Sequence, residues 1–480
     1  MNKPPVPQAV PYVYTRHGIS VEDPYAWLKD PGYPEVSDPK ILAYLRAEND
    51  YFESQMGPYR PLVDDLFEEL KAREPEEDAG VPYRKGRFWY QWRFAHGAQY
   101  RTWLRAPLTQ PHSPPPSDHA AWKVFLDEPL LAKEHNYFVL GGFSISRNDR
   151  YLAWTADVNG SERFTLYVKD METGELLAEP ISDTTGAPVW VADNSRFFYV
   201  IVNEQWRPYQ VRLHQLGKPR SAEHVVYEEN DESFFVDVDE TTSEDFILIS
   251  AGDHVTSEIR YLPADDPTAE LSLFAPRRTG HEYSVDHGEG FFYFMSNASH
   301  KNFALLRAPQ ATPEEACWEP LLTGTDEQYL KWFSRFRGRL VIGERIAGLE
   351  QVKVLDDGGD DYLIDFPEAT HSVGPGTNAE YDATALRVHY QSMVTPGTVF
   401  DFHFADGRLE QLKQQRIPTG YDGSRYATDR LTAIARDGTR VPVSIVYRRN
   451  LPRDGSAPLY LYAYGAYGIA TMPGFSANRL

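Results

Sequence analysis

The 480-residue chain carries 48 basic and 70 acidic residues, a formal net charge of −22 at pH 7, with 41% hydrophobic and 14% aromatic residues. This composition is typical of a folded, strand-rich protein and excludes a disordered chain. The acidic balance argues against nucleic acid as a partner, because phosphate binding needs a basic surface. A negative field favours cationic substrates instead, although it also serves solubility.

Location is constrained by two further features of the sequence. Cys317 is the only cysteine, so no intrachain disulfide can form. The N-terminus lacks the apolar run of a signal peptide, and no segment approaches the roughly 18 apolar residues that a membrane span requires. We therefore expect a cytoplasmic protein with no membrane partner.

Residues 1–75 read as an N-terminal arm with two helices. Asp38 can cap a helix that begins at Pro39, and apolar residues recur at helical spacing from Ile41 to Met56. A second helix is expected near 62–72, with an apolar face of its own. Both faces need a partner, and we expect them to pack against residues from 416 onward.

Residues 76–415 contain short aromatic and β-branched runs separated by turn residues. The strongest of these signals recur about every 47 residues after a longer first interval, centred on Phe88, Leu152, Phe198, Ile247, Phe292, Val341 and Val388. A repeat of this length with about four short strands predicts a β-propeller blade, so seven copies predict seven blades. A β-sandwich is the alternative, but its strands do not repeat at this interval.

Residues 416–480 have a different pattern. A hairpin is expected around Asp437-Gly438, with alternating apolar residues on both sides. The sequence LYLYAYGAYG at 459–468 then predicts a buried strand that opens into a Gly- and Tyr-rich loop, the arrangement by which α/β sheets present functional groups. This segment is predicted to begin an incomplete α/β domain.

Standard motifs for chemistry are missing from the 480 residues. No G-x-S-x-G nucleophile elbow, H-E-x-x-H zinc motif, P-loop or dinucleotide fingerprint is present. The acidic run DDGGDD at 356–361 lacks the spacing of a calcium loop and is expected to be a turn. We therefore expect no metal and no cofactor.

The order of segments, a helical arm, a propeller and then a hairpin with a Gly/Tyr loop, resembles the prolyl oligopeptidase family of serine peptidases. Stretches that carry the resemblance include DPYAWLKDP at 23–31, LGGFSISRNDRYLAW at 140–154, ARDGTRVPVSIVY at 435–447 and YAYGAYG at 462–468. Their details are more similar to the oligopeptidase B branch than to prolyl oligopeptidase proper. The resemblance implies a seven-bladed β-propeller inserted in an α/β-hydrolase domain, of which only the N-terminal arm and the first strands are present.

The resemblance also assigns roles to two tyrosines. Tyr464 matches the phenol that donates a hydrogen bond to the oxyanion of the tetrahedral intermediate, and Tyr467 matches a residue of the substrate-binding pocket. A packing role is the alternative for each. The catalytic serine, aspartate and histidine would lie beyond Leu480. Met472, Pro473 and Gly474 stand where some relatives carry acidic residues, which argues against a preference for paired basic residues.

The function implied is a serine endopeptidase that hydrolyses short peptides on the carboxyl side of Lys or Arg, with the propeller limiting substrate size. Its expected partners are short basic peptides and the C-terminal hydrolase segment, without which the 480 residues are expected to be inactive. A non-catalytic propeller that binds a peptide or protein, and a prolyl-specific member of the same family, remain as alternatives.

Overall fold

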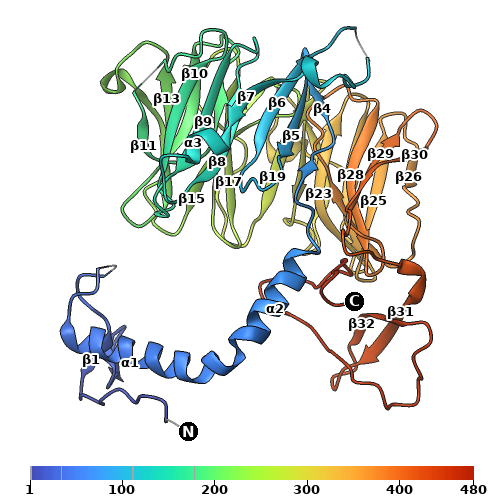
Figure 1. The fold of residues 1–480 in the computed structure, drawn as a ribbon. Helices are drawn as coiled ribbons and strands as arrows, with labels where there is room; N and C mark the ends of the chain where they lie inside the picture. Colours follow the sequence, from blue (N-terminus) through green and yellow to red (C-terminus); the bar gives the residue numbers. More distant parts are fainter. Residues whose placement is uncertain (1–2, 34, 111–112, 178) are drawn as a thin grey trace. The chain divides into compact units, whose positions relative to one another are not determined.

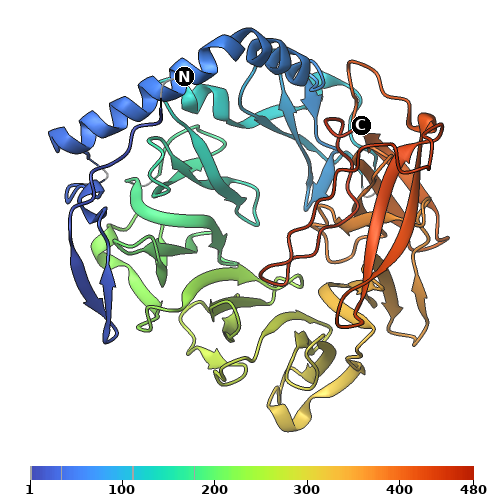
Figure 2. The ribbon, with the colours of Figure 1, turned by 90° about the horizontal axis from the view of Figure 1, so that it is seen from below.

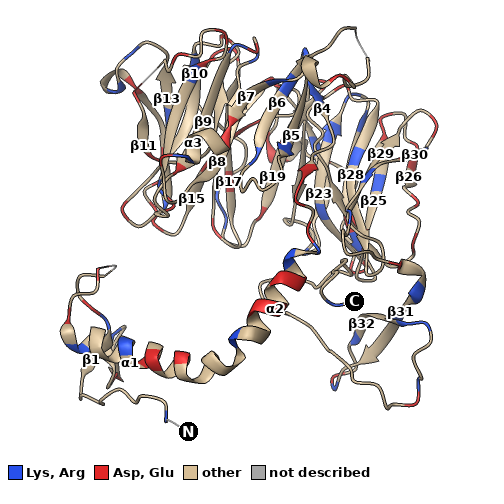
Figure 3. Cartoon of the chain, in the orientation of Figure 1, with Lys and Arg blue, Asp and Glu red and all other residues tan. Residues whose placement is uncertain are grey.

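The computed structural model describes residues 3–33, 35–110, 113–177 and 179–480. The chain forms two compact units, Met1–Glu74 with Ile417–Thr419 and Pro75–Arg416 with Gly420–Leu480 (Figure 1). Acidic and basic residues are distributed over the helices and the sheets rather than gathered in one terminal segment (Figure 3). Among the described residues, no helix combines the length and the apolar character needed to cross a membrane.

The first unit contains a hairpin and two helices. Its elements are β1 (Val13–Arg16), β2 (Ile19–Glu22), α1 (Pro39–Met56) and α2 (Arg60–Lys71), with 3₁₀ turns at Ala26–Leu28 and Gly57–Tyr59. The Asp38 carboxylate accepts hydrogen bonds from the backbone N–H groups of Lys40 at 2.7 Å and Ile41 at 3.4 Å. This N-cap confirms the helix start expected at Pro39.

The apolar faces of both helices are exposed in this unit. Leu45 and Phe52 of α1 are 43% and 55% exposed, and the apolar stripe of α2 is 41–60% exposed, comprising Leu62, Val63, Leu66, Phe67 and Leu70. Packing of these faces against residues from 416 onward stays a prediction.

The second unit is a β-propeller whose sheets are arranged around a common axis (Figure 2). The first sheet contains β3 (Asp78–Ala79), β4 (Tyr83–Lys85), β5 (Phe88–Phe94), β6 (Thr102–Pro107) and β7 (Lys123–Asp127). The short helix α3 (Glu128–Ala132) follows it. The next sheet contains β8 (Val139–Ile145), β9 (Tyr151–Asp157), β10 (Phe164–Asp170), β11 (Ile181–Trp190), β12 (Arg196–Val202), β13 (Pro208–Gln215) and β14 (His224–Glu228).

Four sheets of four antiparallel strands complete the ring. They are formed by β15 (Phe235–Glu240), β16 (Phe246–Gly252), β17 (Ser257–Pro263) and β18 (Ser272–Leu273); β19 (Tyr283–Gly288), β20 (Phe291–Ser296), β21 (Ala304–Pro309) and β22 (Glu319–Leu322); β23 (Gln328–Phe336), β24 (Arg339–Ile346), β25 (Leu349–Asp356) and β26 (Asp361–Leu363); and β27 (His371–Pro375), β28 (Ala385–Ser392), β29 (Thr398–His403) and β30 (Leu409–Gln414).

The expectation of a seven-bladed propeller is wrong. In the described residues, five separate blades of four or five strands are present, and the seven strands β8–β14 form one continuous sheet. The two sequence repeats centred on Leu152 and Phe198 both fall in that sheet. They are joined because β11 pairs with β10 through Thr184 and Ile181 and also pairs with β12. A repeat in sequence marks recurring strands, but backbone hydrogen bonding decides where a sheet ends.

Apolar side chains fill the spaces between neighbouring sheets. In β12, six consecutive residues from Phe197 to Val202 are buried, so this strand packs on both of its faces. Phe198 packs with Val238 and Ile249 of the following sheet, and the same arrangement recurs with Phe336, Val352 and Val388 further along the chain. Each Å² of apolar surface that is removed from water stabilises the fold by about 25 cal/mol. These apolar layers are therefore the main source of stability.

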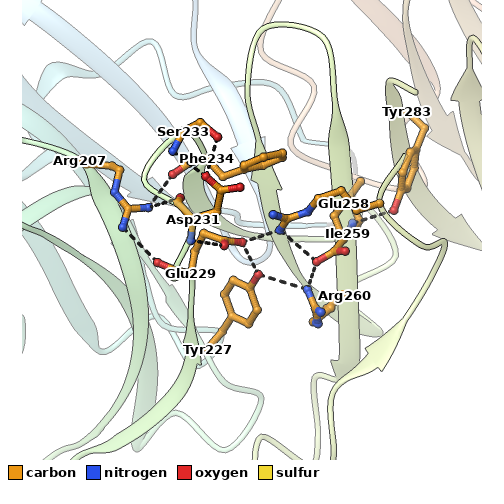
Figure 4. Close-up of polar contacts among 11 residues, drawn as sticks. Arg207, Tyr227, Glu229, Asp231, Ser233, Phe234, Glu258, Ile259, Arg260 and Tyr283 are labelled. Atoms are coloured by element: carbon orange, nitrogen blue, oxygen red, sulfur yellow. Dashed lines mark hydrogen bonds and ion pairs between the residues drawn. The ribbon is translucent and has the colours of Figure 1, made fainter. Parts of the chain in front are cut away.

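Polar side chains also join neighbouring sheets, as in the network between β8–β14 and β15–β18 (Figure 4). The Arg207 guanidinium donates to the backbone carbonyls of Glu229, Asp231 and Phe234 at 3.1, 2.9 and 2.8 Å, which fixes the loop that leads into β15. The Arg277 guanidinium lies between the carboxylates of Glu229 and Glu258, which are 7% and 9% exposed. These contacts hold the two sheets together without strand pairing.

The C-terminal hairpin is confirmed. Strands β31 (Tyr426–Ile434) and β32 (Arg440–Arg448) pair antiparallel, and Gly438 takes a positive φ of 87° in the turn. The strand expected at LYLYAYG is not formed. Residues 449–480, all of them described, contain no strand. Leu459, Tyr460 and Leu461 are 75–76% exposed, and no neighbouring strand satisfies their backbone groups.

Candidate functional site

Among the described residues, the propeller unit contains at least three cavities, and the two larger of these are called proximal and distal. The proximal cavity, ≈ 1030 Å³, includes Pro75 and Arg416 in its lining, and the distal cavity measures ≈ 650 Å³. Strand β23 connects them, because Trp332 lines the proximal cavity and Arg337, just after the strand, lines the distal one. The middle of β23 therefore lines the proximal cavity, and the residue just after its C-terminal end lines the distal cavity.

The proximal cavity has an aromatic lining and an excess of basic residues. Its aromatic side chains include Trp92, Trp103, Phe143, Trp332 and Tyr390. Its charged residues are five basic and three acidic, namely Arg101, Lys331, Arg387, Lys413 and Arg416 against Glu77, Asp78 and Glu350. This balance is opposite in sign to the net charge of the chain.

Three of these cations are neutralised by neighbouring carboxylates. Lys331 donates to Glu350, and Lys413 donates to both oxygens of Asp78 at 2.6 and 2.7 Å. Arg387 makes a two-pronged pair with Asp401 at 2.8 and 2.9 Å. Such bonds fix the side chains of the cavity wall in place.

The proximal cavity lies where the first and last sheets of the ring meet. Lys413 also donates to the carbonyl of Ala79 at 2.7 Å, and Arg387 donates to the carbonyl of Pro82 at 2.7 Å. Within the described residues, strand pairing does not connect β27–β30 to β3–β7. Side chains therefore close the ring at this point.

The distal cavity is strongly acidic. Seven carboxylates and three cations line it, namely Asp149, Asp237, Asp239, Glu240, Glu244, Glu380 and Asp382 against Lys85, Arg147 and Arg337. Burial raises the pKa of Asp237 and Asp239, and it raises that of Glu240 despite the opposing effect of Arg147. The arrangement produces a negative potential that attracts cations.

Asp237 and Asp239 reach the distal cavity together because side chains alternate along a strand. In the β15 sequence FVDVDE, Val236 and Val238 are buried while the two aspartates face the other way. The alternation is visible in the sequence FVDVDE and could have indicated that the two aspartates share a face. Arg101 and the cavity-lining tryptophans were also missed, because residues distant in sequence form the proximal cavity.

Neither Tyr464 nor Tyr467 is among the residues that line the proximal or the distal cavity. Tyr464 is 53% exposed and Tyr467 is 88% exposed, with a positive φ of 53° at Tyr467. The segment that carries them is anchored at its flanks. Tyr421 donates to the carbonyl of Val394 at 2.6 Å, and the backbone N–H of Phe475 donates to Gln391 at 3.1 Å.

Within the described ranges, no group of three or more His, Cys, Asp or Glu side chains is arranged to hold a metal ion. His389 lines the proximal cavity, and burial together with the nearby Arg387 lowers its pKa. This imidazole is therefore neutral near pH 7.

The match to known proteins covers nearly all of the chain. Residues 4–415 match the family model for the N-terminal β-propeller domain of prolyl oligopeptidase. The chain belongs to the prolyl oligopeptidase family. This confirms the resemblance that was drawn from the sequence.

Several peptidases of the prolyl oligopeptidase family are similar to the chain. It is 36% identical over 475 residues to dipeptidyl aminopeptidase BI of Pseudoxanthomonas mexicana, covering 97% of this chain and 65% of the relative. It is 31% identical over 480 residues to protease 2 of Moraxella lacunata, covering 100% of this chain and 68% of the relative. The chain thus spans about two thirds of the length of these relatives.

Solved structures agree with this placement in the prolyl oligopeptidase family. Oligopeptidase B from Leishmania major superposes with a TM-score of 0.90 at 26% identity, covering 99% of this chain and 69% of that protein. Oligopeptidase B from Trypanosoma brucei, with covalently bound antipain, has a TM-score of 0.90 at 25% identity, covering 100% of this chain and 70% of that protein.

Proposed function

We propose that this chain is the propeller-bearing part of a serine peptidase that hydrolyses short peptides. The observation that carries the proposal is the match of residues 4–415 to the family propeller, together with relatives that are named peptidases. The 480 residues contain no G-x-S-x-G elbow. The catalytic serine, aspartate and histidine are therefore assigned to the portion of the relatives' length that this chain does not span.

The preferred substrates in this proposal are peptides cleaved after Lys or Arg. The distal cavity supports this preference, because its seven carboxylates outnumber its three cations and attract a positively charged peptide. The volumes of the two cavities, ≈ 1030 and ≈ 650 Å³, suit a peptide of a few residues and are far too small for a folded protein.

A second candidate activity is release of dipeptides from a free N-terminus. It is favoured by the 36% identity to a relative named dipeptidyl aminopeptidase BI. The acidic distal cavity would attract a free terminal ammonium group as well as a basic side chain. The two candidates therefore differ in which cation the enzyme recognises.

Tyr464 is proposed as the hydrogen-bond donor to the oxyanion, and Tyr467 as a residue of the substrate pocket. Family resemblance supports both roles, and the exposure of both side chains leaves their hydroxyls free to meet a substrate. A neutral, rigid donor directed at developing negative charge stabilises the transition state more than the ground state.

The test uses the complete protein and the peptide Ala-Ala-Arg-Ala-Ala, with and without an N-terminal acetyl group. An endopeptidase cleaves after Arg in both peptides, whereas a dipeptidyl aminopeptidase releases Ala-Ala from the free peptide alone. Mass spectrometry distinguishes the products, and a peptide with Pro in place of Arg tests the prolyl-specific alternative. Absence of cleavage of every peptide would show a non-catalytic binding protein. The 480-residue chain is expected to show no turnover.

A further inference from the structure

Arg101 occupies an aromatic platform in the wall of the proximal cavity. It immediately precedes β6, and its guanidinium carbon lies 4.8 Å from the ring centroid of Trp92, 5.6 Å from that of Phe94 and 6.0 Å from that of Trp103. Its side chain is exposed to the cavity that it lines. The cation is therefore held by ring faces, an interaction that leaves its N–H donors free.

The charge of Arg101 is not neutralised. Throughout the part of the chain that the structure describes, its side chain makes no ion pair and no hydrogen bond, whereas Lys331, Arg387 and Lys413 each bind a carboxylate. Glu128 donates its backbone N–H to the Arg101 carbonyl at 3.2 Å, but its carboxylate accepts from Trp103 Nε1 at 2.6 Å. Arg101 is thus a free, rigid donor in a cavity.

The platform is fixed by its own packing. Trp92 lies so close to Gly80 that a Cβ atom there would come within 2.4 Å of the Trp92 Nε1 atom. Trp92 also meets Phe94 edge to face at 5.8 Å, and the bond to Glu128 fixes Trp103. The guanidinium is therefore positioned before any ligand arrives, which lowers the entropy lost on binding.

A guanidinium is suited to a carboxylate, because two parallel N–H donors match its two oxygens. The aromatic rings on one side exclude water and strengthen the electrostatic attraction. Lys413 lies 5.2 Å from the same Trp92 ring and adds positive charge, although Asp78 neutralises most of it. These properties select an anionic group that is carried by a partly apolar molecule.

We propose that Arg101 binds the C-terminal carboxylate of a short peptide in the proximal cavity. The inference rests on the proposed function, since it assumes a peptide substrate or product. The opposite charges of the two cavities support it, because the acidic distal cavity attracts an N-terminal ammonium group while the basic proximal cavity attracts the carboxylate. A peptide would then bind in one direction.

The experiment is isothermal titration calorimetry of the 480-residue chain with three peptides. These are tetra-alanine, tetra-alanine amide, and N-acetyl-Ala-Asp-Ala-Ala amide, whose only carboxylate is on a side chain. We expect tetra-alanine to bind at least about tenfold more tightly than either amide, the effect of a charge-assisted hydrogen-bonded pair. Arg101→Gln is expected to abolish this difference, and Arg101→Lys to retain part of it because the charge remains.

Arg345→Gln is the matched control. Arg345 lies 4.9 Å from the Tyr329 ring and lies outside the lining of the proximal cavity, so the change removes the same charge and the same type of ring contact. It is expected to leave the acid-to-amide ratio unchanged. Circular dichroism and melting temperature verify that each variant folds.

Three results would overturn the proposal. The first is that tetra-alanine and its amide bind with equal affinity. The second is that the preference for tetra-alanine over its amide survives Arg101→Gln. The third is that the Asp-containing peptide binds as tightly as tetra-alanine. Peptide hydrolysis by the complete protein without a carboxylate preference would refute this site and leave the proposed function intact. Carboxylate-dependent binding by the 480-residue chain, together with absence of hydrolysis by the complete protein, would refute the proposed activity alone.

Discussion

The Lys413 ammonium binds both carboxylate oxygens of Asp78, at 2.6 and 2.7 Å, although the two residues are 335 positions apart in the chain. The pair joins the last sheet of the propeller to the first, where strand pairing between them is absent from the described residues. If one of these two residues is replaced, the charge of the other is left without a partner at the contact between the first and last sheets.

A double-mutant cycle tests this closure. Asp78→Asn, Lys413→Gln and the double variant are compared by urea unfolding. We expect a coupling free energy of about 1 kcal/mol, because the stability changes of two substitutions in one charge-assisted pair do not add. Simple additivity of the two single changes would show that the pair does not close the ring.

The ion pairs of Arg277 with Glu229 and Glu258 predict a large effect of Arg277→Met. This change leaves the carboxylates of Glu229 and Glu258 without their shared cation at 7% and 9% exposure. We expect the free energy of unfolding to fall by about 3 kcal/mol, as is usual when one partner of a buried pair is removed. Arg278→Met is the control, because its pair with Glu315 is 45% and 42% exposed and is expected to contribute less than about 1 kcal/mol.

The effect of Arg277→Met is expected to depend on pH. Burial alone would raise the pKa of Glu229, but hydrogen bonds from Arg277, the Asp231 backbone and Tyr227 lower it overall. A lowered carboxyl pKa stabilises the folded protein above the unfolded value, about 4.3 for glutamate, and this contribution is lost as pH falls through the folded pKa. The difference in unfolding free energy between wild type and variant should therefore shrink below about pH 4. A difference in unfolding free energy that stays constant down to pH 2 would contradict this role of the Glu229 carboxylate.

Asp239 provides the opposite case. The cavity around Asp239 desolvates its carboxyl group and raises its pKa, although the side chain is exposed to the cavity, so its ionised form opposes folding at neutral pH. Asp239→Asn is expected to increase the melting temperature at pH 7, and the gain should disappear as pH falls through the raised pKa, because the wild-type carboxyl is then protonated. The amide oxygen can still accept the bond from the Glu240 backbone at 2.8 Å. Asp360→Asn, at an exposed turn, should change nothing.

Tyr464→Phe tests the proposed oxyanion role in the complete protein. Removal of the hydroxyl is expected to lower the rate of acyl transfer by about 10²–10³, since the charge it stabilises exists mainly in the transition state. The melting temperature should not change, because Tyr464 is 53% exposed. Tyr460→Phe, at 76% exposure, is the control and should leave the single-turnover rate unaffected. An unchanged rate for Tyr464→Phe would remove it from the catalytic residues.

Local features of the fold were predictable from the sequence. The Asp38 cap, the two helices of the arm and the turn at Gly438 follow from residues within a few positions of one another. The conformation of LYLYAYG was not predictable in this way, because an apolar run becomes a strand only where a neighbouring strand pairs with it. The predicted number of separate blades was also wrong, since the pairing of β10 with β11 depends on backbone hydrogen bonds rather than on residue type.

By itself, the sequence determined the family, the propeller architecture and the acidic balance of the chain, because each is recorded in local pattern, composition or extended similarity. Only the tertiary structure decided where charge becomes uncompensated. Arg101 resembles any arginine in the sequence, and its character arises because Trp92 and Trp103 converge on it while Lys331, Arg387 and Lys413 find carboxylates. Pairing between distant side chains depends on three-dimensional distance, which no local pattern specifies.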